Sequence, residues 1–470
     1  MARPIRNSKL VERRSLQDGD NTRTGSTLKL PHRSNITLAR LQDESRADQN
    51  AWSDGNGPQG FLAKRSTILR VVELFAGAGG MGLGFMLAGR ARRRFQLIFS
   101  GEIHPIYVET LRHNHRVLSR LQEGAGHCAP EDICAVDLAK KQTLEHVASL
   151  VREAGGIDVL IGGPPCQGFS NANRNSWSSD NPNNRLVSVF MKYVVRLKPP
   201  VFLMENVQGI VWTSRNGNAN PLSVAEHILK RMKALGYLVF PKLLDAVWYG
   251  VPQYRTRFFL LGIREDIGYS TQAFGGWGPF PIPTHGPTAG CPFVTIREAI
   301  GDVPAIGNGH SQEEMDYRAP AKKAISDYLK SMRKGAPTGS ISDHITSRHA
   351  DYVIERYKRI PAGGNWRDIA EMMSNYSELD RTHSNIYKRL RWDEPSITIG
   401  HYRKSMLVHP VQHRGLSLRE ACRLQSFPDW FRFSGALNGA SGGLMHKQQQ
   451  LANAVCPLVS KAIAGFLLEL

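Results

Sequence analysis

Short apolar runs alternate with helix-like segments along residues 70–264. The apolar runs have the length and composition of buried strands, and they predict strands at 70–75, 95–99, 157–161, 201–204, 238–240 and 258–261. Between them, apolar residues recur at helical spacing, which predicts a helix beginning at Pro105 and helices over 138–153, 189–197 and 222–235. This alternation is typical of an α/β fold with a doubly wound, mostly parallel sheet.

The regular pattern is confined to the middle of the chain. Residues 1–66 are polar and almost free of aromatic residues, which predicts a disordered basic extension. A transit peptide is the weaker alternative, because the segment contains several acidic residues. Beyond Arg264 the chain is rich in Gly, Pro, His, Lys and Arg, with short helices predicted at 296–300 and 350–358. We expect this part to form a separate domain of loops and short strands.

The composition narrows the class of protein. A formal charge of +19 indicates a polyanionic partner, with nucleic acid ahead of an anionic membrane and of a basic enzyme that lacks such a partner. Six cysteines in 470 residues do not form a disulfide framework, and neither they nor the histidines show zinc-ligand spacing. No run of about 18 apolar residues is free of charges and glycines, and no apolar segment follows the basic start. We therefore expect a cytoplasmic protein without a metal or a membrane span.

A glycine-rich turn follows the first predicted strand. Residues 77–82 satisfy the G-x-G-x-x-G template, and Glu102 ends the second strand. Glycines let a nucleotide cofactor approach the backbone, and the acid can hold ribose hydroxyls. Alone, this pattern would suggest a nicotinamide dehydrogenase, and a turn that serves packing only is the other alternative.

Two further strands end in groups that can take part in chemistry, and two arginines precede a third strand. Cys166 follows an apolar run through Gly-Gly-Pro-Pro, which predicts a nucleophile at the carboxyl edge of the sheet or else a small buried hydrophobe. Glu205 emerges at the same edge, as a general acid or a strand-capping carboxylate. Arg255 and Arg257 alternate toward one face, where they suit an anion or form a solvated basic edge. A dehydrogenase needs no such set, so a different enzyme is favoured.

In this combination and order, the motifs resemble those of the DNA cytosine-5 methyltransferases of bacterial restriction–modification type. The resemblance covers residues 71–470 and rests on Phe75–Gly80, Glu102, Asp132–Ile133, Pro164–Gln167, Glu205–Val207, Gln253 with Arg255 and Arg257, Arg419–Pro428, and Gln450–Pro457. The chain departs from the family at Ala452, where glycine is usual, and at Cys456, where proline is usual.

The resemblance implies a catalytic and a cofactor-binding set. Cys166 would add to C6 of cytosine, and Glu205 would act as an acid at N3. Arg257 would hold O2 of the base or support Glu205, while Arg255 would order the loop or contact a phosphate. The residues implied for S-adenosylmethionine are Phe75, Ala76, Gly77, Gly79, Gly80, Glu102, Ile103, Asp132, Ile133, Pro164, Asn453 and Val455.

The resemblance also implies a domain division and partners. Residues 67–264 and 441–470 would form the S-adenosylmethionine-dependent, Rossmann-like catalytic domain, and residues 265–440 a target-recognition domain. Double-stranded DNA is the expected substrate of a monomer, with a restriction endonuclease acting on the same sequence as a further partner. Residues 170–185 would close on a flipped base. Candidates for reading bases are Arg381, Arg389, Arg391, Arg403 and Lys404.

Two alternatives remain open at this point. A transfer-RNA cytosine-5 methyltransferase shares the catalytic set, although the length of the chain between Arg257 and Arg419 favours a duplex-reading module. A catalytically silent DNA-binding protein would be expected to lose Cys166 or Glu205, and both are present.

Overall fold

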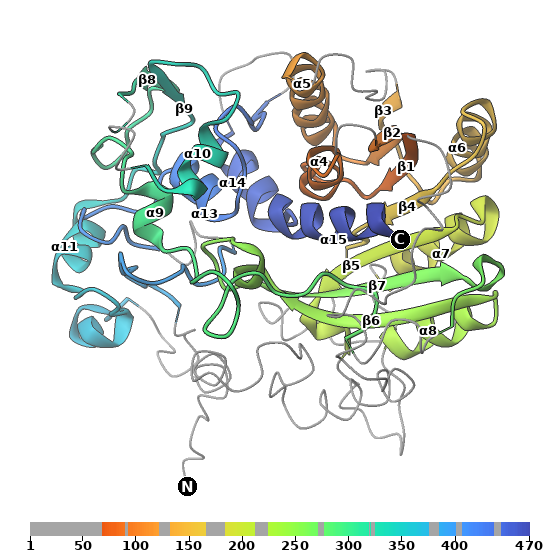
Figure 1. Cartoon of the computed structure of the whole chain (residues 1–470). Coiled ribbons are helices and arrows are strands. Elements are labelled where there is room, and N and C mark those ends of the chain that lie inside the picture. The colour runs from red at the N-terminus through yellow and green to blue at the C-terminus, as the bar shows by residue number, and fades with distance from the viewer. Residues whose placement is uncertain are drawn as a thin grey trace, which may run out of the picture.

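The centre of the computed structural model is a seven-stranded sheet in the order β3-β2-β1-β4-β5-β7-β6 (Figure 1). The structure describes residues 68–89, 93–121, 132–165, 184–211, 224–270, 277–318, 320, 325–375, 385–400, 407–436 and 443–470. The strands are β1 (Ile68–Leu74), β2 (Arg94–Glu102), β3 (Ile133–Ala135), β4 (Val159–Gly162), β5 (Val201–Val207), β6 (Tyr237–Asp245) and β7 (Thr256–Arg264). The predicted α/β class and the mostly parallel sheet are confirmed.

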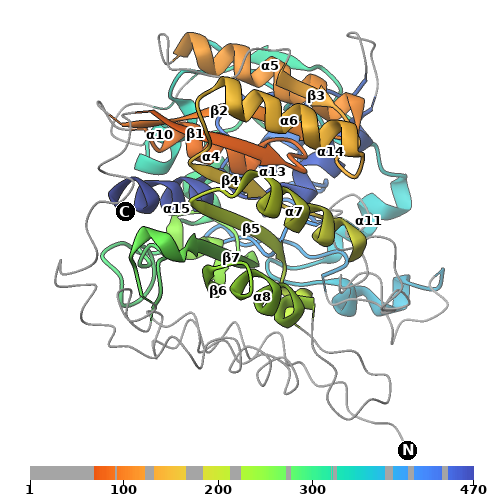
Figure 2. The ribbon, with the colours of Figure 1, turned by 90° about the vertical axis from the view of Figure 1, so that its right-hand side faces the viewer.

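Helices cover both faces of the sheet, which explains why most residues of its strands are apolar and buried. One face is covered by α4 (Gly80–Leu87), α5 (Pro105–Leu121) and α15 (Pro457–Glu469). Figure 2 shows the opposite face, which is covered by α6 (Lys141–Glu153), α7 (Asn184–Leu197) and α8 (Val224–Lys233). Short 3-10 helices lie at Gln208–Val211, Ala246–Tyr249, Glu265–Ile267 and Trp366–Met372.

Strand β7 is the exception to the parallel arrangement, since it runs antiparallel to both β5 and β6. The connection from β6 to β7 is short, and short connections suit antiparallel neighbours. As a result, the start of β7 lies beside the end of β5, and Val207 is paired with Arg257. The reversal brings the arginine-bearing segment to the same sheet edge as Glu205.

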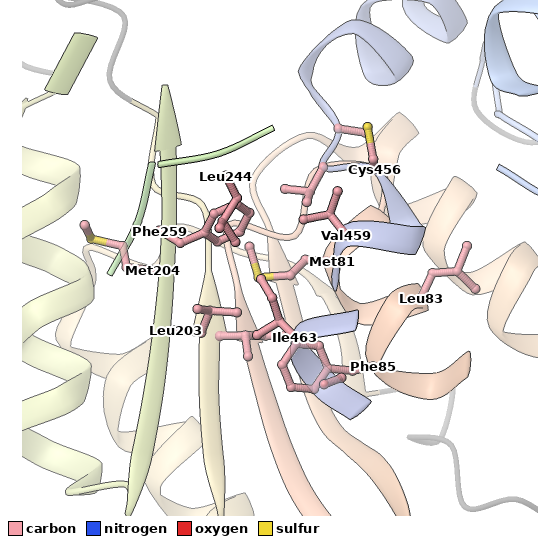
Figure 3. Packing of buried hydrophobic residues seen from close by; sticks show 14 of the residues in the cluster. Met81, Leu83, Phe85, Leu203, Met204, Leu244, Phe259, Cys456, Val459 and Ile463 are labelled. Atoms are coloured by element: carbon pink, nitrogen blue, oxygen red, sulfur yellow. The ribbon is translucent and has the colours of Figure 1, made fainter. Parts of the chain in front are cut away.

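The C-terminal end of the chain returns to the first helix of the sheet domain. Helix α15 packs so closely on α4 that a Cβ atom at Gly84 would lie 2.4 Å from the Cβ of Ser460. Figure 3 shows Val459 and Ile463 of α15 near Met81 of α4, among side chains of the sheet.

Among the described residues, one segment is long and apolar enough to cross a membrane, namely Leu444–Glu469. Most of that segment is buried inside the protein. It comprises α14 (Leu444–Asn453) and α15, which are separated by a turn. The segment therefore has the character of core helices.

The region after β7 contains short elements, as the sequence predicts. They are α9 (Ile296–Ile300), α10 (Asp327–Arg333), α11 (Asp351–Arg359), α13 (Leu418–Leu424) and the antiparallel pair β8 (Glu314–Asp316) and β9 (Ser340–Ser342). The helices expected at 296–300 and 350–358 are confirmed.

Packing is continuous across the expected domain boundary at residue 265. The main core includes residues from the sheet, together with Ile296, Leu418 and Phe427. A second, smaller core contains Tyr357, Tyr387 and their neighbours. The division into a catalytic and a recognition domain stays a prediction.

Candidate active site

The glycine-rich turn between β1 and α4 adopts left-handed backbone conformations. Gly77 has φ 57° and Gly79 has φ 82°, which glycine adopts without steric cost. Phe75 also has a positive φ, of 54°, which is uncommon for a residue with a side chain. The Glu102 carboxylate accepts hydrogen bonds from the backbone N–H of Gly77 (2.9 Å) and of His104 (3.0 Å). These bonds orient the carboxylate toward the turn, and its remaining lone pairs can accept hydrogen bonds from hydroxyl groups.

A second carboxylate, Glu73, lies underneath the turn. It is 1% exposed and accepts hydrogen bonds from the Gly82 backbone N–H (2.8 Å) and the Ser100 hydroxyl (3.0 Å). The N-cap residue of α4, Gly79, has no side chain, so Glu73 supplies the missing acceptor from β1. Burial raises the pKa of Glu73 to about 7. The sequence analysis did not single out Glu73, although an acid inside an apolar strand is a usable signal.

The turn between α14 and α15 meets the glycine-rich turn. A Cβ atom at Gly80 would lie 2.2 Å from the Val455 carbonyl oxygen, so only glycine fits there. Asn453 is exposed at the end of α14, where its side-chain oxygen accepts a hydrogen bond from Gln449 (3.0 Å). Ala452 lies within α14 and Cys456 has φ −68°. Neither position requires the residue that is usual in the family.

The remaining expected cofactor residues lie on neighbouring strands. Ile133 begins β3 and pairs with Ser100 of β2, and Asp132 directly precedes it. Ile103, after Glu102, is 68% exposed. The space above Gly77 is open, since a Cβ atom there would meet nothing within 4 Å. An open backbone turn, a hydroxyl acceptor and an exposed apolar side chain suit the adenosine part of S-adenosylmethionine.

A buried acid lies at the end of β5. Glu205 is 9% exposed, and its Oε1 lies 3.3 Å from Nε of Arg257. A Cβ atom at Gly163 would lie 3.1 Å from Oε2 of Glu205, and Asn206 donates a hydrogen bond to the Pro164 carbonyl (2.9 Å). Burial raises the pKa of Glu205, while Arg257 and Arg255 oppose that rise.

Arg255 lies beside this acid but faces the C-terminal turn. It is 2% exposed and donates hydrogen bonds to the carbonyls of Ala452 (2.7 Å), Ala454 (3.0 Å) and Ile399 (2.9 Å). Its guanidinium therefore connects the acid site with the segment that abuts Gly80.

One candidate for base readout is contradicted by the structure. Arg389 is 4% exposed, and its guanidinium bonds to the carbonyls of Ile360 and His409 (both 2.7 Å), so it is unavailable to DNA. Arg391 is exposed beside Glu394, at 3.3 Å. Several other expected features lie outside the described residues: Cys166, residues 170–183 of the loop predicted at 170–185, Arg381, Arg403, Lys404 and the extension 1–66. The last two residues of that predicted loop, 184 and 185, begin α7. The structure does describe Gly163–Pro165, directly before Cys166.

Comparison with known proteins gives consistent matches along almost the whole described chain. The family model for C-5 cytosine-specific DNA methylase matches residues 69–469. The Type II methyltransferase M1.HphI of Haemophilus parahaemolyticus is 32% identical over 407 residues, which cover 86% of this chain and 87% of that protein. The Type II methyltransferase M.DdeI of Desulfomicrobium norvegicum is 29% identical over 405 residues, covering 84% and 88%.

A solved structure is similar as well. It is a prophage-encoded protein from E. coli that is described as a DNA modification methyltransferase. It superposes with a TM-score of 0.61 at 25% identity, over 85% of this chain and 98% of that one.

The buried carboxyl of Glu73 predicts a pH-dependent stability. Its pKa of about 7 in the folded protein lies above the ordinary value of 4.5, so the folded state binds more protons between these values and stability falls as pH rises through them. Glu73→Gln keeps an acceptor for Gly82 and removes the titration. We expect the free energy of unfolding of the variant, relative to wild type, to rise by about 3 kcal/mol between pH 4 and pH 8.

Urea unfolding at several pH values measures this difference. The matched control is Gln142→Ala on α6, an exposed side chain without an ionisable group, for which the difference from wild type in the free energy of unfolding should not depend on pH. A pH-independent difference for Glu73→Gln would contradict the role assigned to its burial.

Proposed function

Because the chain belongs to the C-5 cytosine-specific DNA methylase family, we propose that it methylates C5 of a cytosine within one short sequence of double-stranded DNA. Its family membership makes the protein a DNA cytosine-5 methyltransferase of type II kind. We further propose a covalent step at Cys166, a base flipped out of the duplex, and a role for each residue of the site. The observation that supports them most is the Glu205–Arg257 pair beside the turn that leads to Cys166.

The proposed cofactor is S-adenosylmethionine, which supplies an electrophilic methyl group when bound. Glu102 would hold its ribose hydroxyls, and Ile103 would lie against its adenine. The Asp132 carboxylate would accept a hydrogen bond from the adenine amino group. The remaining contacts would come from the two turns, through Phe75, Ala76, Gly77, Gly79, Gly80, Ile133, Pro164, Asn453 and Val455.

Cytosine C5 is a poor nucleophile, so the base must first be activated. The Cys166 thiolate would form a bond to C6, and the electrons of the C5–C6 double bond would move toward N3. Glu205 would neutralise the charge at N3, because burial raises its pKa and keeps its proton available. Once the methyl group is on C5, a base such as solvent water would take the C5 proton, the C5–C6 double bond would form again, and the bond from C6 to sulfur would break to release the Cys166 thiolate. N3 would return its proton to Glu205.

The two arginines would have different roles. Arg257 would orient Glu205 and reach O2 of the base, since its Nε already lies 3.3 Å from the carboxylate. Arg255 would act as a positioning residue, because its hydrogen bonds go to backbone carbonyls of the C-terminal turn and of Ile399.

DNA recognition would require the base to leave the duplex, at a cost of a few kcal/mol. The loop 170–185 would close over it, and residues 265–440 would read the flanking sequence. We further propose a cytoplasmic monomer whose methylation protects DNA from an endonuclease with the same specificity.

The covalent step predicts a trapped complex. DNA that contains 5-fluorocytosine cannot lose a proton from C5, so wild-type protein with S-adenosylmethionine should form an adduct that survives denaturation. Cys166→Ala should form none, whereas Cys291→Ala, at an exposed cysteine, should behave as wild type. Absence of an adduct with the active wild-type protein would refute the mechanism.

The acid step predicts a defect in chemistry without a defect in binding. Glu205→Gln should slow single-turnover methyl transfer by about 10²–10⁴ while DNA affinity changes little. Glu145→Gln, at an exposed carboxylate on α6, is the matched control. An unchanged single-turnover rate for Glu205→Gln would remove this residue from the chemistry.

A further inference from the structure

The ends of two helices meet at the turn that abuts Gly80. Helix α14 ends at Asn453 and α15 begins at Pro457, so carbonyls of one helix and N–H groups of the other need partners there. The N-cap residue of α15 is Cys456, whose side chain makes no capping hydrogen bond. The C-cap residue of α14 is Ala454, and no glycine ends that helix.

A dipeptide after α13, Gln425-Ser426, supplies partners to both ends. The side-chain amide of Gln425 donates to the carbonyls of Leu451 and Ala454, both at 2.7 Å. The Ser426 hydroxyl accepts from the backbone N–H of Leu458 at 3.2 Å, as an N-cap side chain would. Two consecutive residues therefore bracket the turn from its two sides. We call them the bracket.

The geometry of the bracket is specific. Gln425 is 0% exposed and Ser426 is 1% exposed, and Ser426 has φ 63°, a conformation that glycine adopts far more readily than serine. The next residue, Phe427, places its ring 3.2 Å from the position of a Gly80 Cβ atom. The same short segment thus contacts both the C-terminal turn and the glycine-rich turn.

Among the described residues, the bracket has no hydrogen bond to Glu205 or Arg257, although Gln425 shares the Ala454 carbonyl with Arg255. Arg255 also donates hydrogen bonds to carbonyls at this turn. It lies two residues from Arg257, so a substitution at Arg255 would disturb the acid site as well as the turn. Within the described part of the chain, the side-chain amide of Gln425 donates to the carbonyl of Leu451 in the last turn of α14 and to that of Ala454. A change at the bracket should move Asn453 and Val455 while leaving Glu205 and Arg257 in place.

From these contacts we infer that Gln425 and Ser426 are positioning residues that set the affinity for S-adenosylmethionine without touching it. The inference rests on the proposed function, since it takes the glycine-rich turn and Asn453–Val455 as the cofactor site. A bracket that only stabilised the fold would change stability and all affinities together. A positioning bracket changes cofactor affinity alone.

Two variants separate these possibilities. Gln425→Met keeps the size of the side chain and removes both donors, so the dissociation constant for S-adenosylmethionine should rise about tenfold or more. Ser426→Gly removes the hydroxyl but relieves the positive φ, so the fold should keep its stability while the dissociation constant rises roughly threefold to tenfold. The matched control is Gln448→Met on α14, whose amide donates to Ser347 at 3.3 Å and away from the turn.

The experiment uses the full chain and titration calorimetry with S-adenosylmethionine, followed by steady-state kinetics on duplex DNA and thermal unfolding. We expect a raised KM for S-adenosylmethionine in both bracket variants, with the KM for DNA and the rate at saturating cofactor within twofold of wild type. If Gln425→Met does not fold, Ser426→Gly carries the test.

Cofactor affinity within twofold of wild type in a folded bracket variant would overturn the inference while leaving the proposed function intact. Parallel losses of stability, DNA affinity and cofactor affinity would overturn it as well. A wild-type protein that does not bind S-adenosylmethionine would overturn the proposed function and this inference with it.

Discussion

The approach of the Val455 carbonyl to Gly80 is the contact on which the rest of the structure depends. Any side chain at Gly80 would collide with that carbonyl, because its Cβ atom would lie only 2.2 Å away. The contact joins the first turn of the sheet domain to the last turn of the chain. Helix α15 must then pack on α4, which it does at the equally close approach of Gly84 to Ser460. The proposed cofactor site would therefore be complete only when the C-terminal helices have returned to the sheet.

Side chains from distant segments hold this contact in place. Arg255 reaches the turn from the start of β7, and Gln425 reaches it from the end of α13. Because β7 runs antiparallel to β5, the same segment also carries Arg257 to Glu205. One segment, Arg255–Arg257, therefore contacts both the acid that would act on the base and the turn that would hold the cofactor.

Much of the fold and of the site could be predicted from the sequence, because both are encoded locally. The apolar runs predicted six of the seven strands, and the glycine-rich turn and Glu205 were recognisable from their positions after strands. The three-residue strand β3 and the direction of β7 were not predicted, since periodicity carries no information about strand pairing. Gln425 and Arg389 illustrate the same limit, because their roles depend on partners that lie far away along the chain.

Some of the cations that contribute to the net charge are buried in ion pairs, so the net charge alone does not identify the residues that contact DNA. Arg423 is buried between Asp302 (2.5 Å) and Asp429 (2.8 Å), and Lys447 lies 2.9 Å from Asp343. Removing one partner of such a pair would leave an uncompensated buried charge and would lower the free energy of unfolding by about 3–5 kcal/mol. These ion pairs join segments within the region after β7, and their cations are not available to phosphates. The excess that attracts DNA must lie on exposed residues.

The most direct test of the account is to express the full chain in a host that lacks cytosine-5 methylation and to map 5-methylcytosine in its DNA by bisulfite sequencing. The account predicts methylation at one cytosine of a single short sequence, and none with Cys166→Ala. Methylation found in transfer RNA instead of DNA, or an unmethylated genome in cells that contain the folded protein, would contradict it.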